Sequence, residues 1–206
     1  MLKTFYMEDV LEAGLDEAGR GPLFGRVYTA AVILNPNETY DFNLIKDSKK
    51  LSERKRLIAF DYVKENAIDF SIDFNDEKCI DNMNILQATY NSMHKALDKL
   101  TVVPEHLLID GNYFIPYTNL KTYEHIPHVC VKSGDNTYAS IAAASILAKV
   151  SRDKYIINLC DNNPELDEYY SIRSNKGYGA KKHMNGIKEH GISKWHRKSF
   201  APCNKY

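Results

Sequence analysis

Two carboxylates stand side by side near the start of the sequence, at Asp16 and Glu17. They follow an apolar run, residues 10–15, whose residue types suit a buried strand. Hard divalent cations such as Mg²⁺ bind oxygen ligands, which carboxylates at a strand end can supply. Neighbouring residues on a strand point to opposite faces, so both acids can serve one site only where the strand ends or twists. Such an acid pair could also simply begin a surface loop.

Two further acids, Asp110 and Asp135, also follow short apolar runs, residues 106–110 and 126–132. Each acid by itself could cap a helix or lie in a turn. If all four acids converged on one edge of a sheet, they would instead form a site for two metal ions. Such ions activate a water molecule and stabilise the leaving oxygen of a phosphodiester, without a catalytic serine or a covalent intermediate.

The segment after the acid pair is a turn that contains Gly19, Arg20 and Gly21. Backbone amides can approach a sugar or a phosphate closely only where no side chain intervenes, and Arg20 adds a planar cation. The same residues could equally form no more than a tight turn between two strands.

The elements that would position these residues indicate an α/β domain. A second strand is predicted over residues 27–34, and a helix over residues 51–66 with Ser52 as its N-cap. Further helices are predicted over residues 80–100 and 138–158, and the second is rich enough in alanine to pack closely on the sheet. We expect a catalytic core over residues 1–160 and a small helical basic extension over residues 161–206.

Charge is distributed unevenly along the chain. Its 206 residues include 27 basic and 27 acidic ones, and 44% are apolar, which is enough for one sizeable core. Residues 171–206 contain nine Lys and Arg but only one acid, Glu189, which indicates either a phosphate-binding face or a solvated basic one. The four cysteines lack C-x-x-C spacing, and no segment resembles a signal peptide or a membrane span. We expect a soluble, cytoplasmic protein with reduced thiols and no membrane partner.

Six blocks of the sequence closely resemble the ribonuclease HII family, in the order that the family shows and over almost the whole chain. The blocks are GLDEAGRGPLFGRVYTAAVIL (14–34), DSKKLS (47–52), LIDGN (108–112), KSGDNTYASIAAASILAKVSRD (132–153), NKGY (175–178) with His183, and HRKSF (196–200). The resemblance implies a ribonuclease H-like fold, in which helices flank a mixed central sheet of about five strands. It also implies a C-terminal helical extension over the substrate groove.

The resemblance further implies an endonuclease that hydrolyses the RNA strand of RNA/DNA hybrids and cuts 5′ of ribonucleotides embedded in duplex DNA. Its products would carry 3′-hydroxyl and 5′-phosphate ends, and its role would be removal of ribonucleotides and RNA primers in DNA replication and repair. Two Mn²⁺ or Mg²⁺ ions would be held by Asp16, Glu17, Asp110 and Asp135. A monomer is expected.

Substrate recognition is also implied by the resemblance. Gly19, Arg20 and Gly21 match the turn that contacts the ribonucleotide 2′-hydroxyl, the group that distinguishes RNA from DNA. Tyr178 matches the tyrosine that stacks on the adjacent deoxyribose. The basic segment 173–198 is predicted to contact phosphates. The same is predicted for Lys49, Ser145, Lys149 and Arg152, although Lys149 and Arg152 could equally be helix-surface charges.

Several residues depart from the family pattern or are left outside the predicted site. Phe24 and Arg26 replace a small residue and a proline, Tyr28 replaces a smaller residue, and the run before Asn175 is a few residues longer. Asp153, which follows Arg152 in a predicted helix, is assigned to a structural ion pair and left out of the site. The histidines His183, His190 and His196 are expected at the surface or facing phosphate.

Two alternatives remain open. Ribonuclease HIII shares the nuclease core but usually has an extra N-terminal substrate-binding domain, for which the roughly nine residues before the first predicted strand leave no room. A non-catalytic binder of RNA/DNA hybrids would keep the fold without the chemistry, although all four acids are present here.

Overall fold

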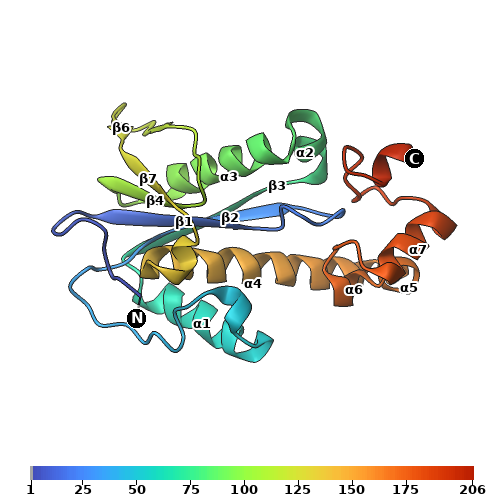
Figure 1. The fold of residues 1–206 in the computed structure, drawn as a ribbon, viewed down its shortest axis with the longest axis horizontal. Helices are drawn as coiled ribbons and strands as arrows, with labels where there is room; N and C mark the ends of the chain where they lie inside the picture. Colours follow the sequence, from blue (N-terminus) through green and yellow to red (C-terminus); the bar gives the residue numbers. More distant parts are fainter. Residues whose placement is uncertain (1) are drawn as a thin grey trace.

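A computed structural model describes residues 2–206 of the chain (Figure 1). Its centre is a five-stranded sheet in the order β3-β2-β1-β4-β7. The pairs β1–β2 and β2–β3 are antiparallel, whereas β1–β4 and β4–β7 are parallel, which confirms the predicted mixed sheet. These strands are β1 (Glu12–Ala18), β2 (Val27–Ile33), β3 (Asp69–Asn75), β4 (His106–Asp110) and β7 (His128–Val131). The strands β5 (Tyr117–Thr118) and β6 (His125–Ile126) form a separate two-stranded sheet.

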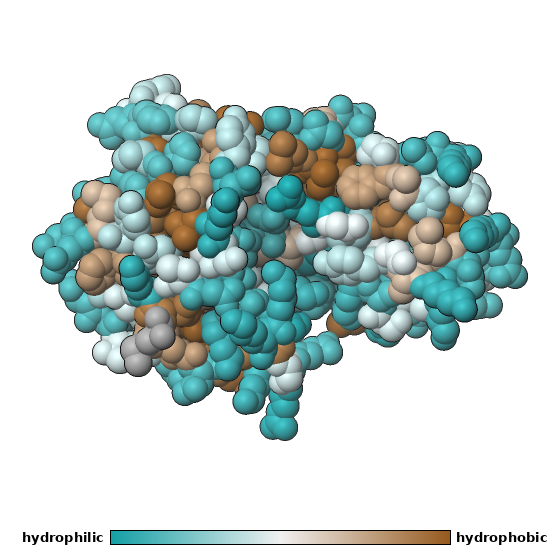
Figure 2. Space-filling model, in the orientation of Figure 1, coloured by the Kyte–Doolittle hydropathy of each residue, from teal (hydrophilic) through white to brown (hydrophobic). Residues whose placement is uncertain are grey.

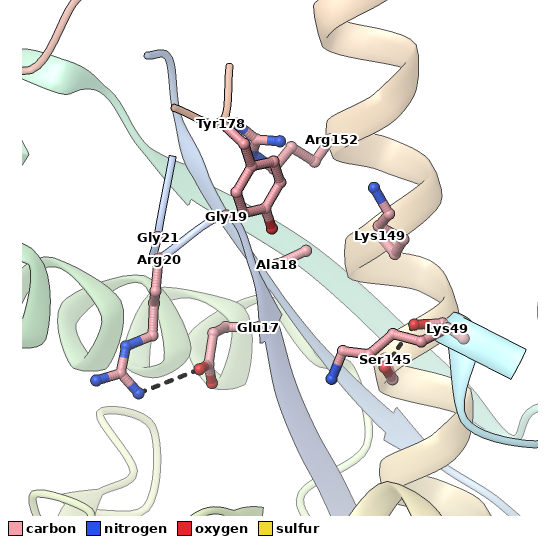
Figure 3. A pocket seen from close by; sticks show the side chains of 11 residues that line it. Glu17, Ala18, Gly19, Arg20, Gly21, Lys49, Ser145, Lys149, Arg152 and Tyr178 are labelled. Carbon is pink, nitrogen blue, oxygen red and sulfur yellow. Dashed lines mark hydrogen bonds and ion pairs between the residues drawn. The ribbon is translucent and has the colours of Figure 1, made fainter. Parts of the chain in front are cut away.

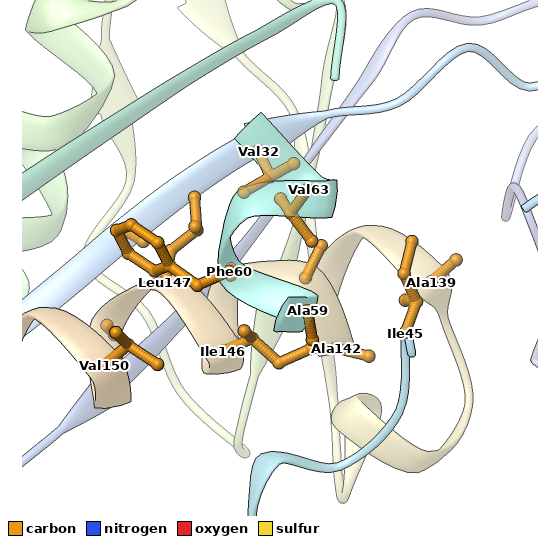
Figure 4. Close-up of a cluster of buried hydrophobic side chains, with 14 of the residues drawn as sticks. Val32, Ile45, Ala59, Phe60, Val63, Ala139, Ala142, Ile146, Leu147 and Val150 are labelled. Carbon is orange, nitrogen blue, oxygen red and sulfur yellow. The ribbon is translucent and has the colours of Figure 1, made fainter. Parts of the chain in front are cut away.

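Helices cover both faces of the central sheet (Figure 1). On one face, α4 (Ala139–Asn162) packs on β1 and β2, and α1 (Glu53–Asn66) packs outside it around a core that includes Val32, Phe60 and Leu147 (Figure 4). On the other face, α3 (Ile85–Lys99) packs on β2 and β3, preceded by α2 (Glu77–Met83). Each strand of the sheet centre is therefore buried on both sides.

Helix α4 lies close to the sheet because both surfaces are thin at their contact. A Cβ atom on Gly14 of β1 would come within 2.3 Å of the backbone carbon of Ser140, so only glycine fits there. The helix adds a run of buried alanines, Ala142, Ala143 and Ala144. The predicted close packing of this helix is confirmed, and it fixes α4 beside the acid-bearing end of β1.

The C-terminal segment is helical, as predicted, and lies beyond one end of the sheet (Figure 1). It contains α5 (Glu165–Tyr170), α6 (Ile172–Asn175), α7 (Lys181–His190) and the short 3-10 helix η3 (Cys203–Lys205). Its apolar residues share a core with Leu23 and Phe24, from the loop between β1 and β2. This shared core attaches the extension to the turn that follows the acid pair.

Several elements differ from the predictions. The helix predicted over residues 80–100 is two helices, because Asn84 has φ +70° and caps α3 through the N–H groups of Leu86 and Gln87. Pro127 separates β6 from β7 within the predicted strand 126–132. Strand β3 was not predicted. Helix α4 continues to Asn162. It therefore crosses residue 160, where we predict the boundary between core and extension, and that division stays a prediction.

The predicted N-cap of α1 is confirmed. The hydroxyl of Ser52 accepts a hydrogen bond from the N–H of Lys55 and caps α1. All four cysteines are free. None of the helices in residues 2–206 has the length and apolar character needed to cross a bilayer. Figure 2 shows that one face of the molecule is mostly hydrophilic, with apolar residues in separate patches.

Candidate active site

Strands β1 and β4, which are neighbours in the sheet, bring Asp16, Glu17 and Asp110 to one place. Strand β4 runs parallel to β1, and their pairing ends at Leu15 and Ile109. Asp110, the last residue of β4, therefore lies next to Asp16. Beyond that point no strand in residues 2–206 pairs with β1 on the β4 side, so side chains from either face of β1 can reach around the end of β4. Strand β1 itself continues to Ala18, paired with β2, so the acid pair lies inside β1 and the expectation that the strand ends before it is wrong.

Asp135 reaches the same edge from the segment after β7. It lies in the short 3-10 helix η2 (Gly134–Asn136), and the carboxylate of Asp110 accepts a hydrogen bond from the N–H of Gly134 at 2.7 Å. That bond fixes η2 against the end of β4. The structure thus brings the four predicted acids to one edge of the sheet, from β1, β4 and η2.

The electrostatics show that these acids interact. Burial raises the pKa of Asp16 well above its ordinary value, and the charges of Glu17 and Asp110 raise it further. Burial also raises the pKa of Glu17, against the opposing effect of Arg20. The pKa of Asp135 is raised by burial and then by Asp47 and Asp110. A buried cluster of carboxylates that raise one another's pKa values favours a bound cation.

Lys49 faces this cluster from the 3-10 helix η1 (Ser48–Lys50). Burial alone would lower its pKa, but four surrounding acids raise it above its ordinary value. The acids are Asp135, Asp47, Asp16 and Asp110. Asp47 was not predicted in the site. Its side chain caps η1 by accepting from the N–H of Lys49 at 2.9 Å, so it also positions that lysine.

Each predicted metal ligand is held in place by a local hydrogen bond or ion pair. Asp16 accepts from the N–H of Glu17 at 2.6 Å, Glu17 from Arg20 at 3.3 Å, and Asp135 from Asn136 at 2.9 Å. As arranged, no three His, Cys, Asp or Glu side chains within residues 2–206 form a group that could hold a metal ion. The donor set nevertheless fits a hard divalent cation, because it is made only of carboxylates and each has a second oxygen.

A pocket beside the acids is lined by the predicted substrate residues, except the Lys and Arg of the basic segment 173–198 (Figure 3). Gly19, Arg20 and Gly21 lie on one side of it, and Lys49, Ser145 and Lys149 lie on the other, from η1 and α4. Glu17 lies between the two sides, and Tyr178 and Arg152 lie at one end. Asp16, Asp110 and Asp135 are not among the lining residues. The structure therefore joins one metal-ligand candidate directly to the predicted recognition residues.

Tyr178 belongs to the loop between α6 and α7. Its side chain is half exposed, and an atom of its ring lies 3.6 Å from the position a Cβ would take on Gly21. An aromatic ring held this way against the glycine turn has a free face on which a sugar or base can stack.

Helix α4 contributes Ser145 and Lys149 from successive turns. The hydroxyl of Ser145 lies 3.0 Å from that of Ser48, and the ammonium of Lys149 lies 2.7 Å from a carboxylate oxygen of Asp153. Asp153 also pairs with Arg56 at 3.5 Å. Asp153 therefore lies in ion pairs, as predicted, but its partners are Lys149 and Arg56 and not the adjacent Arg152, because consecutive helical residues do not face each other.

Some basic residues do not lie where the sequence suggested. Arg152 and Arg197 are buried, so neither is a surface charge, and Arg197 cannot be one of the exposed phosphate contacts predicted in residues 173–198. Arg173 pairs with Asp161 at 2.6 Å. The expectation for two histidines is also wrong: His183 and His196 are buried, with their Nε2 atoms 3.0 Å apart. His190 stacks on Tyr169.

Comparisons with known proteins agree with one family. The family model of ribonuclease HII matches residues 13–203. Ribonuclease HII of Parabacteroides distasonis is 46% identical over 201 residues, which span 98% of this chain and 95% of that protein. Ribonuclease HII of Phocaeicola vulgatus is 44% identical over 200 residues, which span 97% and 94%.

Solved structures show the same fold. Ribonuclease H2 from Pyrococcus horikoshii OT3 superposes with a TM-score of 0.74 at 24% identity, covering 94% of this chain and 95% of that one. Bst-RNase HIII in complex with Mn²⁺ superposes with a TM-score of 0.63 at 17% identity, covering 97% and 70%. The predicted ribonuclease H-like fold is confirmed, and with the sequence matches it shows that this chain belongs to the ribonuclease HII family.

Proposed function

We propose that this chain is an endonuclease that hydrolyses the RNA strand of RNA/DNA hybrids and cuts 5′ of ribonucleotides embedded in duplex DNA. The observation that supports this most strongly is the shared pocket. Glu17, whose pKa responds to Asp110, lines it together with the turn Gly19–Gly21 and Tyr178. Residues that can contact a sugar therefore lie directly beside Glu17, one of the proposed metal ligands.

The proposed ligands of two divalent cations, Mg²⁺ or Mn²⁺, are Asp16, Glu17, Asp110 and Asp135. When bound, such ions activate the attacking water and stabilise the leaving oxygen of the displacement. The family is dependent on divalent metals. The pKa values of Asp16, Glu17 and Asp135 are raised, which means that their negative charges are unfavourable without a nearby cation.

The chain's own residues position the substrate for in-line attack. In the proposed reaction the water oxygen bonds to phosphorus and the bond from phosphorus to the 3′ oxygen of the preceding nucleotide breaks. That oxygen takes a proton and becomes a 3′-hydroxyl, and the ribonucleotide keeps the 5′-phosphate. Backbone amides of the turn Gly19–Gly21 contact the 2′-hydroxyl, Tyr178 stacks on the neighbouring sugar, and Lys49 and Lys149 attract the phosphates.

Replacement of one ligand tests the proposal. Asp16→Asn should abolish cleavage of a duplex with a single ribonucleotide, with either Mg²⁺ or Mn²⁺, while the circular dichroism spectrum is unchanged. Asp61→Asn, the same change at an exposed position of α1, should cleave like the wild type. Mapping the ends of the wild-type product should place the cut on the 5′ side of the ribonucleotide. Full activity of Asp16→Asn would reject the ligand assignment.

The same assay separates the alternatives. A ribonuclease HIII-like enzyme would need a longer RNA run, whereas this chain should cut at a single ribonucleotide. The HII assignment is supported by the family model of ribonuclease HII, which matches residues 13–203, and by relatives of that name that are 44% and 46% identical. A non-catalytic hybrid binder would show no metal-dependent nicking at all.

We further propose that the chain acts as a monomer, which gel filtration can check. Its units would be a core over residues 1–160 and an extension over residues 161–206. Its role would be removal of ribonucleotides and RNA primers during replication and repair, in the cytoplasm.

A further inference from the structure

Arg197 is a fully buried guanidinium that binds the turn of the pocket from behind. It donates to the carbonyl oxygens of Gly19 at 2.6 Å, Pro22 at 2.7 Å, Gly25 at 2.8 Å and Arg20 at 3.0 Å. No carboxylate within residues 2–206 forms an ion pair with it. Burial, and then Arg152, lower its pKa to about 9, so it is charged at neutral pH. A buried charge of this kind is costly unless its hydrogen bonds are made, and here carbonyls make them.

These contacts fix the peptide planes that the pocket uses. A planar trans peptide directs its N–H opposite to its C=O. Because the carbonyls of Gly19 and Arg20 point at Arg197, the N–H groups of Arg20 and Gly21 point away from it, and both residues line the pocket. Neither N–H has a hydrogen-bond partner among residues 2–206. Arg197 therefore orients two free donors.

The neighbouring residue His196 reaches the other recognition element, the loop of Tyr178. Nδ1 of His196 accepts from the N–H of Ser193 at 2.9 Å, so its proton lies on Nε2 and is donated to Nε2 of His183 at 3.0 Å. His183 then carries its proton on Nδ1 and donates to the carbonyl of Tyr178 at 2.8 Å. Burial lowers the pKa of both rings, to about 3 for His196, so both are neutral at pH 7. This chain of hydrogen bonds holds the backbone of Tyr178.

Backbone hydrogen bonds join the same three segments. Leu23 donates to the carbonyl of Gly177, Arg197 donates to that of Leu23, and Gly25 donates to that of Trp195, each at 2.8 to 2.9 Å. The turn and the tyrosine loop are thus both attached to residues 195–197.

We infer that the dipeptide His196-Arg197 positions both elements that read the sugar at the cleavage site: Arg197 sets the amides of the turn Gly19–Gly21, and His196, through His183, sets Tyr178. This inference rests on the proposed function of that pocket. Both are positioning residues, because neither touches substrate. They determine selectivity for a ribonucleotide over a deoxyribonucleotide, and exposed lysines supply affinity for any duplex.

The test compares two duplexes of one sequence, all DNA or with a single ribonucleotide, by fluorescence anisotropy in EDTA. The measured quantity is the ratio of the two dissociation constants. Arg197→Lys, which cannot reach four carbonyls, and His196→Leu, which donates nothing to His183, should each reduce the ratio about tenfold, the effect of one lost hydrogen bond. His196→Gln keeps an amide donor near the position of Nε2 and should keep the ratio within about twofold of the wild type.

Lys198→Ala is the matched control for charge, since it removes an exposed cation next in sequence. It should weaken binding of both duplexes by the same factor and leave the ratio unchanged. The inference is overturned if Arg197→Lys and His196→Leu also weaken both duplexes equally. A wild-type protein that does not distinguish the duplexes would instead reject the proposed function of the pocket.

A measurement on the wild type covers the case in which the variants do not fold. Long-range ¹H–¹⁵N spectra at pH 7 should show His196 protonated on Nε2 and His183 on Nδ1. Titration with the ribonucleotide duplex, but not with the all-DNA duplex, should shift the amide signals of Arg20 and Gly21. Doubly protonated rings, reversed tautomers or equal shifts with both duplexes would refute the inference.

Discussion

Gly21→Ala should reduce activity without reducing stability, whereas Gly19→Ala should reduce both. A Cβ on Gly21 would meet only the ring of Tyr178, at 3.6 Å, which is an ordinary van der Waals distance. Because Gly21 has no positive φ, its replacement should change the free energy of unfolding by less than about 1 kcal/mol, and in the stabilising direction if at all. The new methyl group would stand beside Tyr178, where a sugar must approach the backbone.

Gly19 is in a different position. Its φ of +98° is strained for any other residue, which costs about 1–3 kcal/mol. A Cβ there would lie 2.2 Å from Nε of Arg152, so that side chain must move away from the carbonyls of Phe24 and Arg26. Loss of one hydrogen bond from a charged group adds about 1.5–3 kcal/mol. Gly19→Ala should therefore lower the unfolding free energy by about 3–5 kcal/mol, and the melting temperature by about 10 °C or more.

The assay measures kcat/KM on a duplex with a single ribonucleotide, and thermal unfolding by circular dichroism. Gly21→Ala should reduce kcat/KM at least about tenfold, equivalent to about 1.4 kcal/mol of lost binding in the transition state, with a wild-type melting temperature. Wild-type kcat/KM for Gly21→Ala would refute the claim that the sugar contacts this backbone. Equal melting temperatures for the two variants would refute the reasoning from φ and from Arg152.

Three further outcomes are expected. Tyr178→Phe should retain most of the activity and Tyr178→Ala should lose at least about tenfold in kcat/KM, because the stacking face and not the hydroxyl is used; equal loss in both would contradict this. Mn²⁺ or Mg²⁺ should raise the melting temperature of the wild type more than that of Asp16→Asn, because only the wild type keeps all four proposed ligands. Calorimetric scans with and without EDTA can measure this difference. His196 has a pKa of about 3 in the folded protein against about 6.5 in an unfolded chain, so the unfolded state binds the proton first as pH falls. The unfolding free energy should be insensitive to this group above about pH 6.5 and should decrease below it, by an amount on the order of a few kcal/mol by pH 4; urea titrations should show a shallower pH dependence for His196→Gln.

Asp110 was accessible to sequence reasoning because it ends an apolar run, where a buried strand can deliver a polar residue to a site. Asp16 and Glu17 also follow an apolar run, but they lie inside β1. Strand β4 begins and ends where residues 106–110 predict, and Asp110 is its last residue. The sequence does not contain the order of the strands. Only the parallel pairing of β1 with β4, across more than 90 residues, shows that Asp110 lies next to Asp16.

Two other features of the structure were not predicted from the sequence. Strand β3 was not predicted, although residues 69–75 alternate polar and apolar residues, which is typical of a half-buried strand. The role of Arg197 is different, because its four acceptors lie more than 170 residues away in sequence and are backbone atoms, which no residue type reveals. A basic segment predicts exposed cations, and the burial of this one depends on carbonyl groups that only the fold brings together.

The choice of carbonyls as partners for the buried arginines has a consequence for recognition. A carboxylate would neutralise the guanidinium, whereas carbonyls leave its positive charge in place behind the turn. The carbonyl of Gly19, at 2.6 Å from Arg197, belongs to the same peptide as the N–H of Arg20, so the cation polarises that peptide and strengthens its N–H as a donor. Arg152 acts on the carbonyls of Phe24 and Arg26 in the same way. The acids of the site can then be reserved for metal ions, while positive charge buried under the turn draws the hydroxyl and phosphate oxygens of the substrate toward amides that are already oriented to receive them.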